Sequence, residues 1–233
     1  MRIYLRNYSA DVRASNINLQ KYKKLLCLGI GALYSLQIPP SLSVERLLSI
    51  VAPKEYRIDR TVYLYETIKH YFDEPDAIFV GEFNGCLVLI HDELTWLLLE
   101  KSPGDRAVRI INFFKNSEIV AITENGTSYS FGYALIRNQQ RIRLKIGDDG
   151  EILEDVGTAL DTEKELLADM NKRGQYQELV DENLYEGDSI EQAHQLAQFE
   201  VCWRVPNVLF EQYLRQKLDW LSDNLILTRC LPT

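Results

Sequence analysis

The sequence has few of the residues that build metal centres and disulfide frameworks. Its 233 residues include three His and four Cys. The cysteines are Cys27, Cys86, Cys202 and Cys230, and no Cys-x-x-Cys pair occurs among them. This spacing gives no support to a zinc ribbon or a thioredoxin-like site. We expect reduced and mostly buried thiols, as is typical of a reducing compartment.

A long hydrophobic run is also missing. The most apolar stretch near the beginning, residues 25–38, is too short to span a bilayer and contains Gln37. Residues 1–13 indicate a short strand and a polar turn, and they lack the apolar centre of a secretory signal. We therefore predict a cytoplasmic protein without a membrane partner, in which residues 25–38 form a segment of the buried core.

Motifs for common enzyme chemistries are absent as well. The sequence contains no Gly-x-Ser-x-Gly elbow, so a serine nucleophile of that type has no support. Residues 29–34 begin with Gly-x-Gly, but the third glycine and the lysine of a phosphate-binding loop do not follow. The acidic turn at 148–151 lacks the spacing of a calcium-binding EF-hand loop. The sequence therefore predicts neither a cofactor nor a metal.

One short cluster is a candidate for chemistry. His91, Asp92 and Glu93 are consecutive, and they form the only place where a histidine adjoins two carboxylates. Side chains alternate along a strand, so the three cannot all face one metal ion. A turn after a strand explains the same residues. An enzyme of unfamiliar type, with its catalytic site near His91, is kept as an alternative.

The composition that is present indicates a folded, acidic protein. Apolar residues make up 46% and charged residues 26% of the chain, so wholesale disorder is excluded. The formal net charge of −8 disfavours binding to nucleic acid. Arg141, Arg143 and Lys145 alternate with apolar residues in a predicted strand, and nearby aromatic residues would suit a nucleic-acid platform. The acidic residues that follow favour internal charge pairing instead.

Local patterns predict one α+β domain over residues 1–233, with a central antiparallel sheet packed against N- and C-terminal helices. The first part, residues 1–75, leans towards helix. Ser43 can cap a short helix that Pro53 closes. Apolar residues recur at helical spacing over 61–72, which predicts a second helix.

The middle of the chain, residues 76–157, has the patterns of an antiparallel sheet. Asn84-Gly85 lies between two apolar, β-branched runs, and this dipeptide predicts a tight hairpin. Further apolar runs, separated by Asn-Gly and Asp-Asp-Gly turns, predict a meander over 118–157. Residues 104–115 interrupt the strands and favour a helix.

The last part of the chain, residues 158–233, is expected to form a helical lobe. Thr162 can cap a helix, with Glu165 in the capping-box position. Ser189 can cap a second helix. Pro206 is placed to open a third helix, because proline is favourable in a first helical turn.

An acidic stretch separates two of these predicted helices, and its pattern indicates a polar loop. Its carboxylates are Glu178, Asp181, Glu182, Glu186, Asp188 and Glu191. Charge runs of this kind are usually solvated linkers. The functional interpretation is a surface that meets a basic protein partner through charge complementarity.

Residues 126–167 have a more specific pattern. An aromatic-glycine-aromatic strand leads to a strand that begins with Arg141 and Arg143, then a Gly-Asp turn follows, and a capped acidic helix comes last. This segment resembles one in uncharacterised bacterial proteins, some of them encoded beside polymorphic toxins. The resemblance is confined to these residues and includes no catalytic residue.

We therefore expect a non-enzymatic, bacterial, cytoplasmic protein that binds another protein. The resemblance implies an immunity protein that binds and blocks a toxin, and an acidic inhibitor would suit a basic toxin. The enzyme with a site near His91 is one alternative. An oligomeric structural or scaffold protein is another, and an apolar stripe left exposed over 206–221 would support it.

Overall fold

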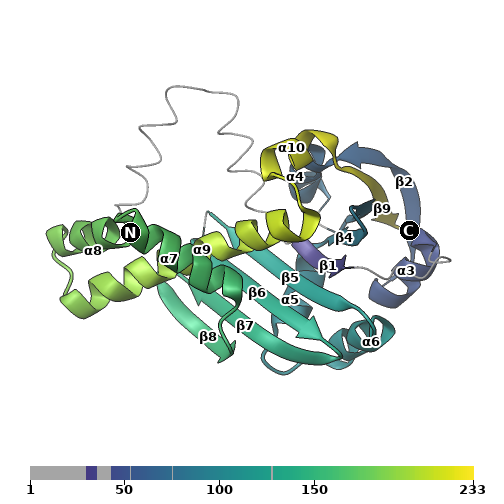
Figure 1. The fold of residues 1–233 in the computed structure, drawn as a ribbon. Coiled ribbons are helices and arrows are strands. Elements are labelled where there is room, and N and C mark those ends of the chain that lie inside the picture. The colour runs from purple at the N-terminus through teal and green to yellow at the C-terminus, as the bar shows by residue number, and fades with distance from the viewer. Residues whose placement is uncertain (1–29, 36–42, 53, 75, 127) are drawn as a thin grey trace.

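The computed structural model describes residues 30–35, 43–52, 54–74, 76–126 and 128–233. Within these ranges, the strands join into one antiparallel sheet of nine, in the order β2-β9-β3-β4-β1-β5-β6-β7-β8. Helices cover both faces of this sheet (Figure 1). This architecture confirms the predicted α+β class and its central antiparallel sheet.

Strands and helices follow one another in mixed order along the chain. The strands are β1 (Ile30–Ser35), β2 (Tyr56–Tyr63), β3 (Ile78–Phe83), β4 (Cys86–Ile90), β5 (Glu118–Asn125), β6 (Ser130–Arg137), β7 (Gln140–Asp148), β8 (Glu151–Gly157) and β9 (Ile226–Pro232). The helices are α3 (Val44–Val51), α4 (Leu64–Asp73), α5 (Asp92–Leu99), α6 (Asp105–Phe113), α7 (Asp161–Lys172), α8 (Gln175–Tyr185), α9 (Ile190–Leu214) and α10 (Leu218–Asn224).

Alternate side chains of the central strands enter two hydrophobic clusters, one on each face of the sheet. In β4, Val88 enters the cluster beneath α9 and α10, whereas Leu87 and Leu89 enter the cluster beneath α3, α5 and α6. Side chains alternate across a strand, so a strand covered on both faces must be apolar throughout. β4 meets this requirement, because all its residues are apolar and buried.

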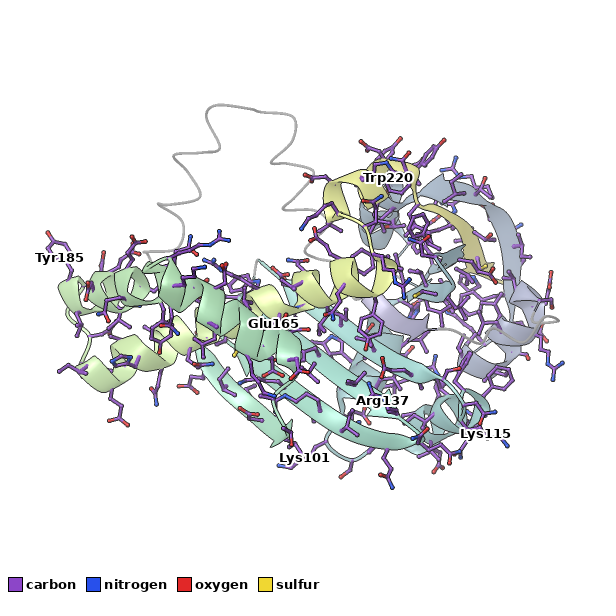
Figure 2. The ribbon with its side chains drawn as sticks, in the orientation of Figure 1. Lys101, Lys115, Arg137, Glu165, Tyr185 and Trp220 are labelled. Atoms are coloured by element: carbon purple, nitrogen blue, oxygen red, sulfur yellow. The ribbon has the colours of Figure 1, made fainter. Side chains whose placement is uncertain are left out.

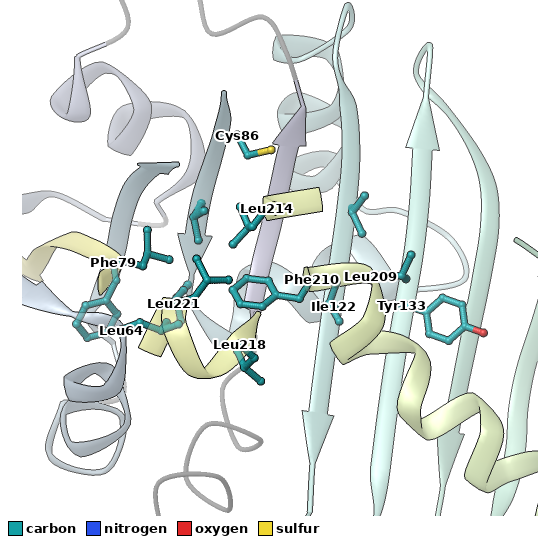
Figure 3. Close-up of a cluster of buried hydrophobic side chains, with 14 of the residues drawn as sticks. Leu64, Phe79, Cys86, Ile122, Tyr133, Leu209, Phe210, Leu214, Leu218 and Leu221 are labelled. Carbon is teal, nitrogen blue, oxygen red and sulfur yellow. The ribbon is translucent and has the colours of Figure 1, made fainter. Parts of the chain in front are cut away.

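The cluster on the α9 face joins the sheet to the C-terminal helices (Figure 3). Phe210 and Leu214 of α9 and Leu221 of α10 are fully buried in it, together with sheet residues such as Phe79 and Ile122. Burying one such side chain contributes about 1.5–3 kcal/mol relative to leaving it exposed. These helices are therefore packed firmly onto the sheet.

Several local predictions are confirmed. Asn84 and Gly85 connect β3 to β4, and their φ angles of 48° and 77° are the left-handed values that this tight hairpin requires. β5, β6, β7 and β8 pair in sequence order and form the meander expected over 118–157. α6 lies within 104–115, and Ser43 caps α3.

The prediction of one helix over 61–72 is wrong at its beginning. Residues through Tyr63 belong to β2, and α4 starts only at Leu64. β2 pairs with β9, a strand in the part of the chain that was expected to be helical. Backbone pairing with a distant segment overrides the helical spacing here, and local periodicity cannot reveal such a partner.

Pro206 lies inside the long helix α9, so the prediction that it opens a new helix is wrong. A proline inside a helix removes one backbone hydrogen bond and usually kinks or breaks the helix. Its neighbours Val205, Leu209 and Phe210 are buried against the sheet. Their burial offsets the lost hydrogen bond and keeps both halves of α9 in one helix.

The start of α7 also differs from the prediction. Its N-cap is Leu160, so Thr162 and Glu165 lie inside the helix and do not form the cap. Glu163 takes the capping-box position, where its carboxylate accepts a hydrogen bond from Leu160 N–H at 3.0 Å. The same carboxylate binds Arg143 of β7, and this contact with the sheet fixes the register of the helix start.

Three sequence predictions fall wholly or partly outside the described residues. The strand and turn expected over 1–13 lie outside them, as does Cys27. Of the apolar segment 25–38, the structure describes β1, which lies between β4 and β5 in the middle of the sheet. The other three cysteines are buried free thiols, as predicted.

Candidate functional site

The histidine of the His91-Asp92-Glu93 cluster has a structural role. His91 is the N-cap of α5, and its Nδ1 accepts a hydrogen bond from Leu94 N–H at 3.3 Å. The residue is 6% exposed, and burial lowers the pKa of His91. A neutral imidazole that accepts at Nδ1 is what this cap requires.

The carboxylate of Glu93 is used in helix packing. It accepts a hydrogen bond from Arg106 Nη1 of α6 at 2.7 Å, and Arg106 also donates to the backbone oxygen of Val51 in α3. These contacts hold α3, α5 and α6 together. The side chain of Asp92 lies outside the described part of the structure. Capping and packing thus give His91 and Glu93 structural roles.

The acidic residues predicted to bind a partner lie mainly on a helix. They belong to α8 and to the turn that follows it, and they are Glu178, Asp181, Glu182, Glu186 and Asp188. The prediction of a loop is wrong because the segment has an apolar side. On that side, Leu179 and Val180 pack against Ala193 and Ala197 of α9.

The outer side of α8 is acidic and carries one large exposed aromatic side chain. Residues three and four apart share a helix face, so Asp181 and Glu178 lie on the same side as Tyr185. Tyr185 is 91% exposed, and Ile190 at the start of α9 is 68% exposed. Figure 2 shows Tyr185 at an outer end of the molecule, beyond the strands.

The sequence offers no positive side chain near these carboxylates along the chain. Residues 174–203 contain neither Lys nor Arg. Arg173, the C-cap of α7, pairs with Asp169 of the same helix at 3.0 Å. An exposed aromatic side chain beside several carboxylates is a combination that suits a protein of opposite charge.

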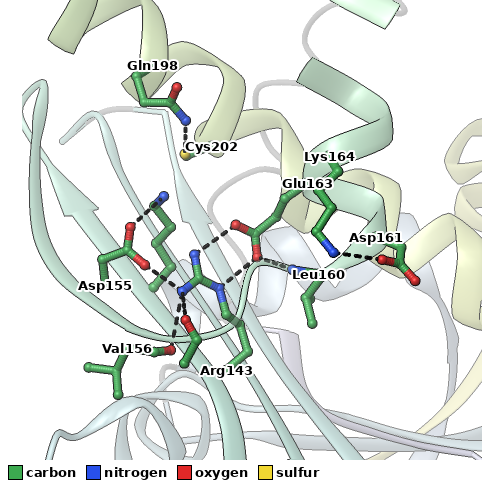
Figure 4. A network of polar contacts seen from close by, with 11 residues as sticks. Arg143, Asp155, Val156, Leu160, Asp161, Glu163, Lys164, Gln198 and Cys202 are labelled. Atoms are coloured by element: carbon green, nitrogen blue, oxygen red, sulfur yellow. Dashed lines mark hydrogen bonds and ion pairs between the residues drawn. The ribbon is translucent and has the colours of Figure 1, made fainter. Parts of the chain in front are cut away.

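A buried charge network joins β7 and β8 to α7 (Figure 4). Arg143 is 2% exposed, and it donates to both carboxylate oxygens of Glu163, at 2.7 and 2.8 Å. Its Nη1 donates to Asp155 at 2.5 Å, and Lys145 Nζ lies 2.9 Å from the other Asp155 oxygen. Arg143 and Lys145 are therefore paired internally, as the sequence predicted, whereas Arg141 donates to the backbone oxygens of Leu98 and Glu100.

A second polar cluster, which sequence reasoning missed, lies between β5 and α9. Glu124 accepts hydrogen bonds from Trp203 Nε1 and from Asn207 Nδ2, the latter at 2.7 Å. Glu200 accepts a hydrogen bond from Tyr129 Oη at 2.5 Å. Burial raises the pKa of Glu124 to about 8, and it raises the pKa of Glu200 as well.

This cluster fastens α9 to the sheet. Raised carboxyl pKa values occur at catalytic acids and also in structural networks. Glu124 is 7% exposed and binds donors from the covering helix, which favours the structural role. A signal was available in the sequence, because Glu200, Trp203 and Asn207 are spaced three and four residues apart and share one helix side.

A hollow of about 240 Å³ lies between α3 and the strands β3, β4 and β9. Its wall includes the apolar side chains of Leu47, Val80 and Leu87, with Glu82 and Thr228 as polar groups. Small-molecule pockets commonly measure about 300–1,000 Å³, so this hollow is small for a substrate.

Within the described ranges, no group of three or more His, Cys, Asp or Glu residues is placed to hold a metal ion. In the same part of the chain, no helix is both long and apolar enough to cross a membrane. Comparison with protein-family models, curated proteins and solved structures found no match to this chain. The resemblance of residues 126–167 to bacterial proteins therefore stays a prediction.

Proposed function

We propose that this chain is a protein-binding protein that meets a basic protein partner with the outer face of α8. The observation that carries the proposal is the exposed Tyr185, which stands among Glu178, Asp181 and Glu182 on that face. Opposite charge would steer the partner towards α8. Tyr185 then supplies the large, rigid contact on which interfaces depend.

A more specific form of the proposal is a bacterial, cytoplasmic immunity protein that binds and blocks a basic toxin. The resemblance of residues 126–167, which include β6, β7 and β8, supports a toxin as the partner. The acidic face of α8 supports a partner that is basic. Association driven by opposite charges is fast and weakens as salt is added.

The two alternatives lack their expected support. An exposed apolar stripe over 206–221 would have supported the scaffold, but Leu209, Leu214 and Leu218 of that stripe are buried in the cluster beneath α9 and α10. The enzyme is less well supported because His91 is buried and its Nδ1 caps α5.

The proposal is tested by capturing partners from a lysate of the source organism with three tagged proteins. The first is the wild type, and the second carries Glu178→Lys and Asp181→Lys on α8. The control carries Glu55→Lys and Glu165→Lys, which make the same charge change at exposed sites elsewhere. We expect a basic protein that the wild type and the control retain, and that the α8 variant retains roughly tenfold less or weaker.

Salt and a titration complete the test. Retention should fall when the salt is raised to roughly 0.5 M, because screening weakens attraction between exposed charges. The captured protein is then purified and titrated against all three proteins. Equal affinity for the wild type and the α8 variant would contradict the proposal, and so would the absence of any basic partner.

A further inference from the structure

Among the described strands the sheet ends at β8, which pairs there with β7 along one side only. The other side of an edge strand presents backbone N–H and C=O groups that can pair with a further strand. Figure 1 shows β8 at the end of the sheet towards α8, and α9 contacts both elements. The open edge and α8 therefore lie towards the same end of the molecule.

Aliphatic side chains are exposed at this edge. Leu153 is 55% exposed, Val156 is 46% exposed, and Ile142 of the neighbouring β7 is 36% exposed. Leu153 has no partner in β7, because the register shifts between Ile146 and Gly147. Natural proteins protect free edges with charges and bulges, and they seldom leave aliphatic side chains exposed there.

Carboxylates accompany these aliphatic side chains. Glu151 is exposed at the beginning of β8, whereas Asp155 further along the strand is already paired with Arg143 and Lys145. Asp148 and Asp149 are exposed in the turn that leads into the strand. Pairing of β8 with the β8 of a second copy would bring these carboxylates together, and like charges disfavour that arrangement.

We infer that β8 receives an extended segment of the basic partner, which joins the sheet as a further strand. The inference rests on the proposed function, because it assigns the binding mode of that partner. The added strand places basic side chains beside Glu151 at the beginning of β8 and aliphatic side chains beside Val156. Its backbone hydrogen bonds supply affinity, and these side-chain contacts supply specificity.

The test uses a fluorescent peptide of alternating lysine and valine, with binding measured by anisotropy. It compares the wild type with Val156→Lys and with Ile58→Lys in β2. Ile58 lies on the opposite edge strand and is 46% exposed, as Val156 is. We expect the wild type and Ile58→Lys to bind the peptide equally, and Val156→Lys to bind it roughly tenfold more weakly or worse.

A second peptide carries N-methyl groups on alternate backbone nitrogens and cannot form a hydrogen-bonded ladder. It should lose binding to the wild type. Equal binding of the two peptides, undiminished affinity of Val156→Lys, or no binding at all would each overturn the strand addition.

The other candidate occupant of the β8 edge is β2 of a second copy of this chain, and β2 carries Arg57. Sedimentation of the wild type tests for this self-association. Self-association that Ile58→Lys abolishes would assign the β8 edge to that copy and overturn the inference. Failure of strand addition leaves the proposed function untouched, because partner capture by the α8 variant is a separate measurement.

Discussion

At the scale of single residues, Glu124 has the environment of an acid that prefers its neutral form. Burial beneath α9 raises its pKa from an ordinary value of 4.5 to about 8. The folded state therefore binds the proton more tightly than the unfolded state does. The resulting stabilisation is fully present below about pH 4.5 and is lost as the pH rises through 8.

The substitution Glu124→Gln should flatten this pH dependence. Glutamine has a similar shape and cannot ionise, so it escapes the cost of a buried charge at high pH. We expect the free energy of unfolding of the wild type to fall by a few kcal/mol more than that of the variant between about pH 5 and pH 8. Urea unfolding at several pH values measures both slopes.

The exposed carboxylate of Glu165 provides the matched control for this prediction. Glu165→Gln removes a carboxylate from α7 without changing the buried layer, and its slope should follow the wild type. If the wild type and Glu124→Gln lost stability in parallel, Glu124 would be ionised in the folded protein, and the explanation would be wrong.

Single residues were predictable where their contacts are local. The Ser189 cap of α9 is confirmed, because its hydroxyl and the side chain of Gln192 satisfy donors within the same turn. The cap of α7 was not predictable in the same way. Glu163 takes the capping-box position in place of Glu165 because it binds Arg143, and the sequence of the helix does not indicate a partner on a distant strand.

At the scale of elements, the same distinction between local and distant contacts applies. Asn84-Gly85 sets the β3–β4 hairpin within two residues, so the sequence predicted it correctly. β9 has no comparable local signal, because its place depends on pairing with β2 and β3 from the first half of the chain. Such long-range pairing lies beyond periodicity and propensity.

The insertion of β9 between β2 and β3 predicts unequal effects at two adjacent positions. Leu227 is completely buried in the cluster beneath α9 and α10, whereas Ile226 is 54% exposed. Leu227→Ala should lower the free energy of unfolding by about 2–5 kcal/mol, through lost burial and the cavity that remains. Ile226→Ala should change it by about 0.5 kcal/mol or less.

Urea unfolding of both β9 variants, followed by far-UV circular dichroism, measures the difference. Similar small effects at the two positions would show that β9 contributes little to the folded sheet. The comparison is strict, because the two residues are neighbours and both are replaced by alanine.

At the scale of the whole molecule, composition revealed a charge but not its arrangement. The acidic segment was visible in the sequence as a run of carboxylates. The helix that orders them was missed, because its apolar side is narrow and consists of Tyr176, Leu179 and Val180. Tyr185 was missed as well, since exposure of an aromatic residue can be judged only once the helix face is known.

The arrangement of the hydrophobic clusters decides how the molecule should unfold. In β5, Ile119 and Ala121 enter one main cluster, while Val120 and Ile122 enter the other. The same strands contribute side chains to both clusters, so neither cluster can separate without disrupting the other. α8 is different, because it packs on a third, much smaller cluster that includes Val180.

Native-state hydrogen exchange in increasing denaturant tests this prediction. The most protected amides of α5 and α9, which cover opposite faces of the sheet, should converge on one free energy of opening. Amides of α8 should exchange through a local opening of lower free energy. Different limiting values for α5 and α9 would instead divide the chain into two folding units. Amides of α8 that exchange readily in the free protein and become protected when a partner binds would also identify α8 as the binding surface of the proposed function.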